Sequence, residues 1–178
     1  MGEVEARPFL EEGEEHLAAG DYAAAQRAFE RAVEAAPDLA VAHSKVGVTL
    51  AHQGQHDAAI ARFSKALQLQ PGYAPAYSNL GNAYKAKGML VEAVAAYQRA
   101  LAIDPEYWIA HQNLGVVYKE MGRIGESVDE LKKATRLSIR QRPRPPAGKS
   151  PRGCLGSAGA VLVVLLGGVA ALAVTGVR

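Results

Sequence analysis

A 34-residue period governs most of this 178-residue chain. Four consecutive blocks begin at Ala6, Ala40, Ala74 and Trp108, and the last block ends at residue 141. Glycine recurs at two fixed places in every block. These glycines are Gly13, Gly47, Gly81 and Gly115 at the first place, and Gly20, Gly54, Gly88 and Gly122 at the second. A period held this strictly indicates a protein built from stacked copies of one small structural unit.

The pattern of each block predicts two antiparallel helices. Large side chains recur on the second half of the blocks, at Phe29, Phe63, Tyr97 and Leu131. A small residue opposite a large one lets two helices approach closely, and offsets of three and four residues keep such residues on one face. The second glycine suits a helix end, and Pro37, Pro71 and Pro105 close three blocks. The predicted helices are 7–19, 23–36, 41–53, 57–70, 75–87, 91–104, 108–121 and 125–139.

The third block carries a family resemblance. Its residues 77–84, with Gly88, Ala93, Tyr97, Ala100 and Pro105, resemble the tetratricopeptide repeat (TPR). The resemblance covers residues 6–141 as repeats 6–39, 40–73, 74–107 and 108–141. It implies an all-α protein, a right-handed α-solenoid of four helix-turn-helix units. The pattern is weakest at the first helix, where Glu12 and His16 depart from it, and in the last helix, where Ser127 and Ile139 do.

Charge is divided unevenly along the chain. All 18 acidic residues lie before residue 136, whereas seven of the 20 basic residues lie at or after it. Residues 142–154 form a basic, proline-rich linker. No aromatic side chains are interleaved with its basic ones, so the cluster is interpreted as flanking a membrane and no nucleic-acid partner is expected.

Residues 155–177 contain no charged side chain. As an α-helix they would measure about 35 Å, enough to cross a hydrocarbon core of about 30 Å, so the sequence predicts a C-terminal transmembrane helix. Basic residues precede this segment and Arg178 alone follows it, which predicts a single-pass, tail-anchored protein with the TPR array on the cytoplasmic side. The first residues lack the apolar core of a secretory signal peptide.

Two alternatives for the tail stay open. It could pack on the array or on a partner of a soluble protein, because solenoids need a capped end. The small-residue pairs Gly156 with Ala160 and Gly167 with Ala171 would also allow a weak homodimer of spans.

The sequence contains no catalytic constellation. His52 and His56 are separated by Gly54, which breaks the helix between them, so they are not predicted to bind a metal as a helical pair. His43 and His111 occupy the place that Tyr77 fills in the third block and are predicted to be packing residues. Cys154 is the single cysteine and cannot form an intramolecular disulfide. We therefore expect no enzyme, no cofactor and no metal.

The TPR resemblance implies a concave groove, formed by the first helix of each repeat, that binds an extended peptide. Carrying the family's groove places onto this chain gives the candidate peptide-binding residues Lys45, Ser78, Asn79, Asn82, Lys85, Gln112, Asn113 and Lys119. Asn79 and Asn113 share one place in the repeat and resemble the asparagine ladder of O-linked N-acetylglucosamine transferase. A carboxamide both donates and accepts hydrogen bonds, although asparagine is also common at this place in the repeat.

Chaperone-binding TPR proteins use a carboxylate clamp with cationic residues at three places. The residues at the clamp places here are Ser44, Val48, Asn79, Ile109 and Asn113, so the clamp is not predicted. The lysines among the candidate residues, Lys45, Lys85 and Lys119, still favour acidic or extended polar peptides in the groove. The sequence thus predicts a membrane-tethered adaptor that binds a partner's peptide segment, with a soluble assembly or co-chaperone-like scaffold as the alternative.

Overall fold

The computed structural model describes residues 2–141, and this part of the chain consists of eight α-helices without a strand. The helices are α1 (Gly2–Ala18), α2 (Tyr22–Ala35), α3 (Ala40–His52), α4 (His56–Leu69), α5 (Ala74–Ala86), α6 (Leu90–Ile103), α7 (Trp108–Glu120) and α8 (Ile124–Gln141). The all-α repeat architecture is confirmed over these residues. The predicted linker, 142–154, and the predicted transmembrane segment, 155–177, lie outside the described residues.

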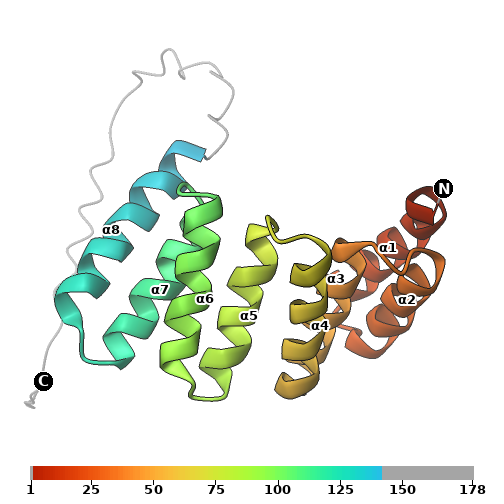
Figure 1. The fold of residues 1–178 in the computed structure, drawn as a ribbon, viewed down its shortest axis with the longest axis horizontal. Helices are drawn as coiled ribbons and strands as arrows, with labels where there is room; N and C mark the ends of the chain where they lie inside the picture. The colour runs from red at the N-terminus through yellow and green to blue at the C-terminus, as the bar shows by residue number, and fades with distance from the viewer. Residues whose placement is uncertain (1, 142–178) are drawn as a thin grey trace, which may run out of the picture. The chain divides into compact units, whose positions relative to one another are not determined.

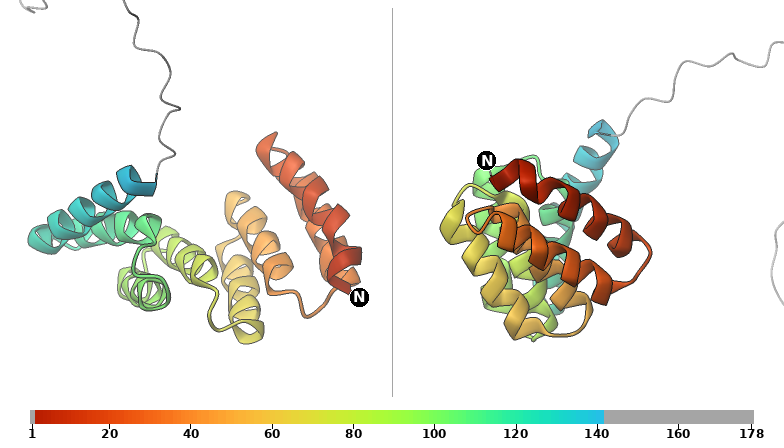
Figure 2. Two further views of the ribbon diagram at one scale, coloured as in Figure 1. Left: turned by 90° about the horizontal axis from the view of Figure 1, so that it is seen from above. Right: turned by 90° about the vertical axis from the view of Figure 1, so that its right-hand side faces the viewer.

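The helices form a linear array of four hairpins (Figures 1 and 2). Within each hairpin α1 packs on α2, α3 on α4, α5 on α6 and α7 on α8. The second helix of each hairpin also packs on the first helix of the next, and α5 contacts both α3 and α7. The first helices therefore follow one another along one side of the array, where the family resemblance places the groove.

Glycine at the first fixed place of each repeat allows the close approach within a hairpin. A Cβ atom on Gly81 would lie 2.7 Å from Cε1 of Tyr97, and one on Gly47 would lie 2.7 Å from Cε1 of Phe63. The aromatic rings of Phe63 and Tyr97 are almost completely buried by this contact. The turn glycines serve differently, because Gly54 has φ of 76°, a left-handed conformation that ends α3.

Two helix ends differ from the prediction by more than one residue. The first helix begins at Gly2 rather than residue 7 and includes Pro8, because Ala6 is buried against Ala32 and Ala36. The last helix continues to Gln141, whose side chain donates a hydrogen bond of 3.0 Å to the carbonyl of Glu106. Tertiary contacts thus extend both ends beyond the repeat pattern. Within residues 2–141, no helix combines the length and the apolar character needed to cross a membrane.

Candidate functional site

The groove side of the array is organised by pairs of residues 31 positions apart. Each pair combines the ninth place of one repeat with the sixth place of the next, and two of the three pairs are in direct contact. Glu14 of α1 forms an ion pair with Lys45 of α3. Asn113 of α7 donates a hydrogen bond of 3.0 Å from Nδ2 to Oδ1 of Asn82 on α5. The middle pair, Val48 and Asn79, combines an apolar side chain with a carboxamide.

A tyrosine from the second helix of repeat three fixes the position of Asn82. The hydroxyl of Tyr97 donates a hydrogen bond of 2.7 Å to Oδ1 of Asn82. Burial, together with the negative charge of Glu120, raises the pKa of Tyr97 well above its usual value, so the hydroxyl stays protonated and remains a donor. Oδ1 of Asn82 thus accepts two hydrogen bonds, from Tyr97 and Asn113. Within residues 2–141 its two amide hydrogens have no acceptor, so they can be donated to a ligand.

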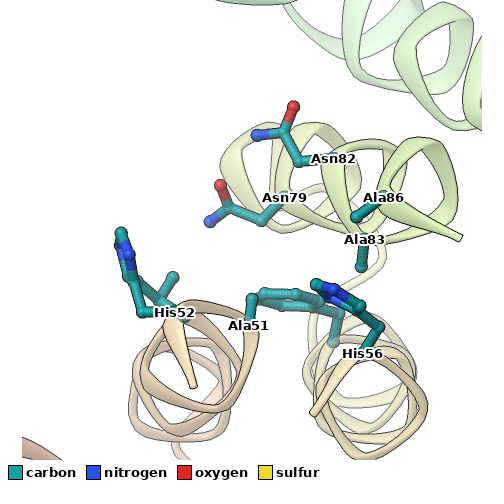
Figure 3. A pocket seen from close by; sticks show the side chains of 9 residues that line it. Ala51, His52, His56, Asn79, Asn82, Ala83 and Ala86 are labelled. Carbon is teal, nitrogen blue, oxygen red and sulfur yellow. The ribbon is translucent and has the colours of Figure 1, made fainter. Parts of the chain in front are cut away.

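A hollow of about 250 Å³ opens beside this network, between α3, α4 and α5 (Figure 3). Its lining combines apolar side chains with carboxamide and imidazole groups: Val48, Ala51, His52, His56, Phe63, Asn79, Asn82, Ala83 and Ala86. Figure 3 shows Asn79 and Asn82 projecting from α5 with their nitrogen atoms turned to the same side. The ring of His52 stacks on Tyr22 of α2, with ring centroids 4.6 Å apart.

Asn79 differs from the other two groove asparagines. Asn82 and Asn113 are bonded to each other, whereas the side chain of Asn79 makes no hydrogen bond within residues 2–141. Val48, at the paired place of repeat two, also lines the hollow and has no polar side-chain group to offer. Asn79 therefore presents both a donor and an acceptor to the hollow.

The remaining candidate residues are divided between the surface and the interior. Gln112 and Lys119 are exposed and Lys85 is half-buried, and none of these three makes an ion pair or side-chain hydrogen bond in the described part of the chain. Lys45 is half-buried and its charge is balanced by Glu14. Ser78, by contrast, is only 1% exposed and its side chain lies inside the array.

The histidines occupy the places that the sequence indicated. His52 ends α3 and His56 begins α4, so they are not a pair on one helix, and the described residues contain no cluster of three metal-ligating side chains. His43 and His111 are buried, and Nε2 of each ring lies within hydrogen-bonding distance of a proline carbonyl, 2.8 Å and 3.1 Å away. His111 has a second partner in Glu130, at 2.5 Å from Nδ1.

Sequence reasoning missed Tyr97 and His56 as residues of the site. Tyr97 is on a second helix, which the family's groove rule omits, and His56 is at the start of another. The available signal was the change from Phe29 and Phe63 to tyrosine at the same place in repeat three. A hydroxyl added to a buried ring needs a partner, which here is Asn82.

Comparison with known proteins identifies the repeat. Three family models, each described as tetratricopeptide repeat, match residues 6–39, 38–106 and 96–129. No curated protein matches the chain. Among solved structures, a thermophilic TPR protein of Thermus thermophilus, TTC0263, is 27% identical over 75% of each chain, with a TM-score of 0.71. MamA (41-end) of Desulfovibrio magneticus RS-1 is 25% identical over 78% of each chain, with a TM-score of 0.67.

A third solved structure contains a bound peptide. It is the first TPR of Spaghetti (RPAP3) bound to an HSP90 peptide. This TPR is 23% identical to the present chain and shares its fold, with a TM-score of 0.64. That match covers 67% of this chain and 95% of the other. The repeat pattern, the hairpin array and the family matches agree, and the chain belongs to the tetratricopeptide repeat family.

Proposed function

We propose that this protein is an adaptor that binds an extended peptide segment of a partner protein in the groove between α3 and α5. The observation that carries the proposal is the carboxamide of Asn79, which lacks a side-chain hydrogen bond within residues 2–141 and borders an apolar hollow. A TPR of Spaghetti (RPAP3), which has the same fold, binds a peptide, and this supports a peptide as the ligand class here.

The chemistry of the hollow suggests how a peptide would lie in it. Asn79 offers a donor and an acceptor, and Asn82 offers amide hydrogens held in place by Tyr97. These groups match the carbonyl and amide groups of an extended backbone. The apolar floor, formed by Val48, Ala51 and Ala83 among others, matches one aliphatic side chain of the peptide.

The distribution of charge along the groove favours binding of the peptide's acidic residues near one end of the array. Glu14 neutralises Lys45 at the N-terminal part of the groove. Lys85 and Lys119, further along, make no ion pair within the described residues. An acidic residue of the peptide is therefore expected beside α5 and α7 rather than beside α1.

A binding experiment tests this proposal directly. Peptides are selected from a displayed library on the full-length protein, and the affinity of the best one is measured by titration calorimetry. Asn79→Ala should weaken binding at least about tenfold, because a backbone group of the bound peptide loses its partner. Gln68→Ala, at an exposed position of α4, is the matched control. Failure to select any peptide, or equal affinity for Asn79→Ala and the parent, would contradict the proposal.

We further propose that residues 155–177 attach the protein to a membrane as a single-pass helix, with the repeats on the cytoplasmic side. The support is in the sequence: 23 residues without a charged side chain follow a stretch of basic ones. Replacing Leu165 and Leu166 by arginine keeps the length of the segment and should release the protein from the membrane fraction. Unchanged membrane recovery would favour the alternative of a soluble scaffold whose tail packs on protein.

A further inference from the structure

The last helix exposes a valine whose equivalent is buried in the preceding repeat. Val128 of α8 corresponds to Val94 of α6, one period earlier, and is 43% exposed where Val94 is 8% exposed. Val94 packs in a cluster with Leu114 and Val117 of α7, the first helix of the next repeat. Within residues 2–141 no helix follows α8, so the corresponding face has no cover there.

This valine belongs to an exposed stripe that runs along almost the whole helix. It contains Ile124, Val128, Thr135 and Ile139. Ile124 is 56% exposed and Ile139 is 64% exposed. The hydroxyl of Thr135 is bonded to the carbonyl of Leu131, at 2.9 Å, so the methyl group is what Thr135 contributes to a packing surface. The face is apolar over about four turns of helix.

The spacing of residues along this stripe is the same in both directions along the helix. Ile124 and Ile139 are equally far from a point between Leu131 and Lys132, and so are Val128 and Thr135. Two copies of α8 related by a two-fold axis through that point would pair Ile124 with Ile139 of the second copy. They would also pair Val128 with Thr135. A two-fold interface requires this self-complementarity.

Charges beside the stripe fit the same arrangement. Asp129, Lys132 and Arg136 lie on the outward flank of α8 and make no ion pair in the described part of the molecule. In the antiparallel register, Asp129 of each copy lies beside Lys132 and Arg136 of the other. In a parallel pair, by contrast, the two copies of this flank would lie on opposite sides of the contact, so Asp129 would not meet Lys132 or Arg136 of the other copy.

We propose that α8 is the contact surface of a homodimer, in which two copies pair through Ile124, Val128, Thr135 and Ile139 in antiparallel orientation. The second copy takes the place that a following repeat would occupy. This inference is independent of the peptide site, because no residue of the stripe lines the hollow between α3 and α5. The resulting dimer presents two peptide grooves.

Cysteine crosslinking on the full-length protein tests both the contact and its direction. With Cys154→Ser as background, Val128→Cys and Thr135→Cys are made separately, purified in mild detergent and oxidised alone and as an equimolar mixture. In the antiparallel pair, residue 128 of one copy meets residue 135 of the other. Residue 128 lies about 10 Å along the axis from its own counterpart, which is beyond disulfide range.

The mixture is expected to yield at least about tenfold more covalent heterodimer than the homodimer formed by either variant alone. Adding Ile139→Asp to both variants should remove this yield, because a carboxylate would be buried in the contact. Val91→Asp is the matched control, since Val91 is an exposed apolar residue of α6 outside the stripe. Efficient crosslinking of a single variant, or no gain in the mixture, would overturn the proposal. The absence of a gain in the mixture is also the result expected if residues 155–177 or another protein cover α8.

Discussion

Repeats two and three have the same backbone architecture but differ at two side chains that face each other. In repeat two, the buried ring is Phe63 and the ninth place is Val48. In repeat three, the corresponding residues are Tyr97 and Asn82, joined by a hydrogen bond of 2.7 Å. Both rings pack on a glycine at the same place in the repeat. The period therefore determines the helix packing, while a departure from it creates a polar site.

Repeat four shows the same principle at a different place. His111 and His43 each contact a proline carbonyl, as their shared place in the repeat requires. Glu130 adds a second contact to His111, whereas the equivalent residue of repeat two is Arg62. What is shared among repeats supports the fold, and what is unique to one repeat gives it a distinct local chemistry.

The largest effect on the free energy of unfolding is expected from replacing the glycines that the repeats share at their helix contacts. Gly81→Val would place atoms within 2.7 Å of the Tyr97 ring, and overpacking of this kind should lower the free energy of unfolding by about 3 kcal/mol. Gly47→Val should cost about as much, because its contact with Phe63 is equally close. Urea denaturation measures both. Gly72→Ala, with no atom within 4 Å of the added Cβ, is the control. A large difference between Gly47→Val and Gly81→Val would show that the two hairpin cores are not equivalent.

Removing the hydroxyl that is unique to repeat three should have a smaller effect on stability. Tyr97→Phe keeps the ring but deletes one hydrogen bond to Asn82, which should cost about 1 kcal/mol in chemical denaturation. The amide of Asn82 would then be held by Asn113 alone, and affinity for a selected peptide should fall as well. An unchanged affinity would show that the orientation of Asn82 does not matter for binding.

The stability of the protein should depend on pH through a carboxyl group that is found in repeat four. Burial opposes ionisation of Glu130, but hydrogen bonds from Lys133 and His111 outweigh it and hold the pKa of the carboxyl group below 4.5, its ordinary value. The stabilisation is therefore present above pH 4.5 and is lost as the pH falls through the lowered pKa. Thermal melts between neutral and acidic pH should show a steeper loss for the parent than for Glu130→Gln. Parallel curves would contradict this assignment.

The smallest effect is expected at an exposed ion pair of repeat one. Arg7 and Glu11 are one turn apart on α1, and their side chains are 78% and 69% exposed. Solvent screens such a pair, so Arg7→Ala should change the free energy of unfolding by less than about 0.5 kcal/mol. A larger loss in urea denaturation would indicate that Arg7 stabilises α1 by packing.

The repeat core could be predicted from the sequence because its determinants recur at a fixed spacing. Glycine opposite a large residue and a glycine turn locate every hairpin, and a terminal proline marks the end of the first three. The start of α1 could not be predicted in this way. It depends on burial of Ala6 against residues of α2 and the following turn, which no local pattern reports.

The groove residues were harder to predict, because their contacts join consecutive repeats. The hydrogen bond between Asn82 and Asn113 depends on how far one first helix is displaced along the next. A usable signal existed in Glu14 and Lys45, opposite charges at the same spacing of 31 positions. Ser78 was assigned to the groove by its place in the family pattern, yet its side chain lies inside the array.

The hollow lies between the two inner repeats, and this position affects how often local unfolding reaches it. In a chain of units that touch only their neighbours, fluctuations begin at the ends and spread inward. The outer hairpins, α1 with α2 and α7 with α8, therefore take up transient opening before it reaches α3 and α5. In an isolated copy of the array, the terminal hairpins are therefore expected to open first, while the hollow between the inner repeats keeps its shape.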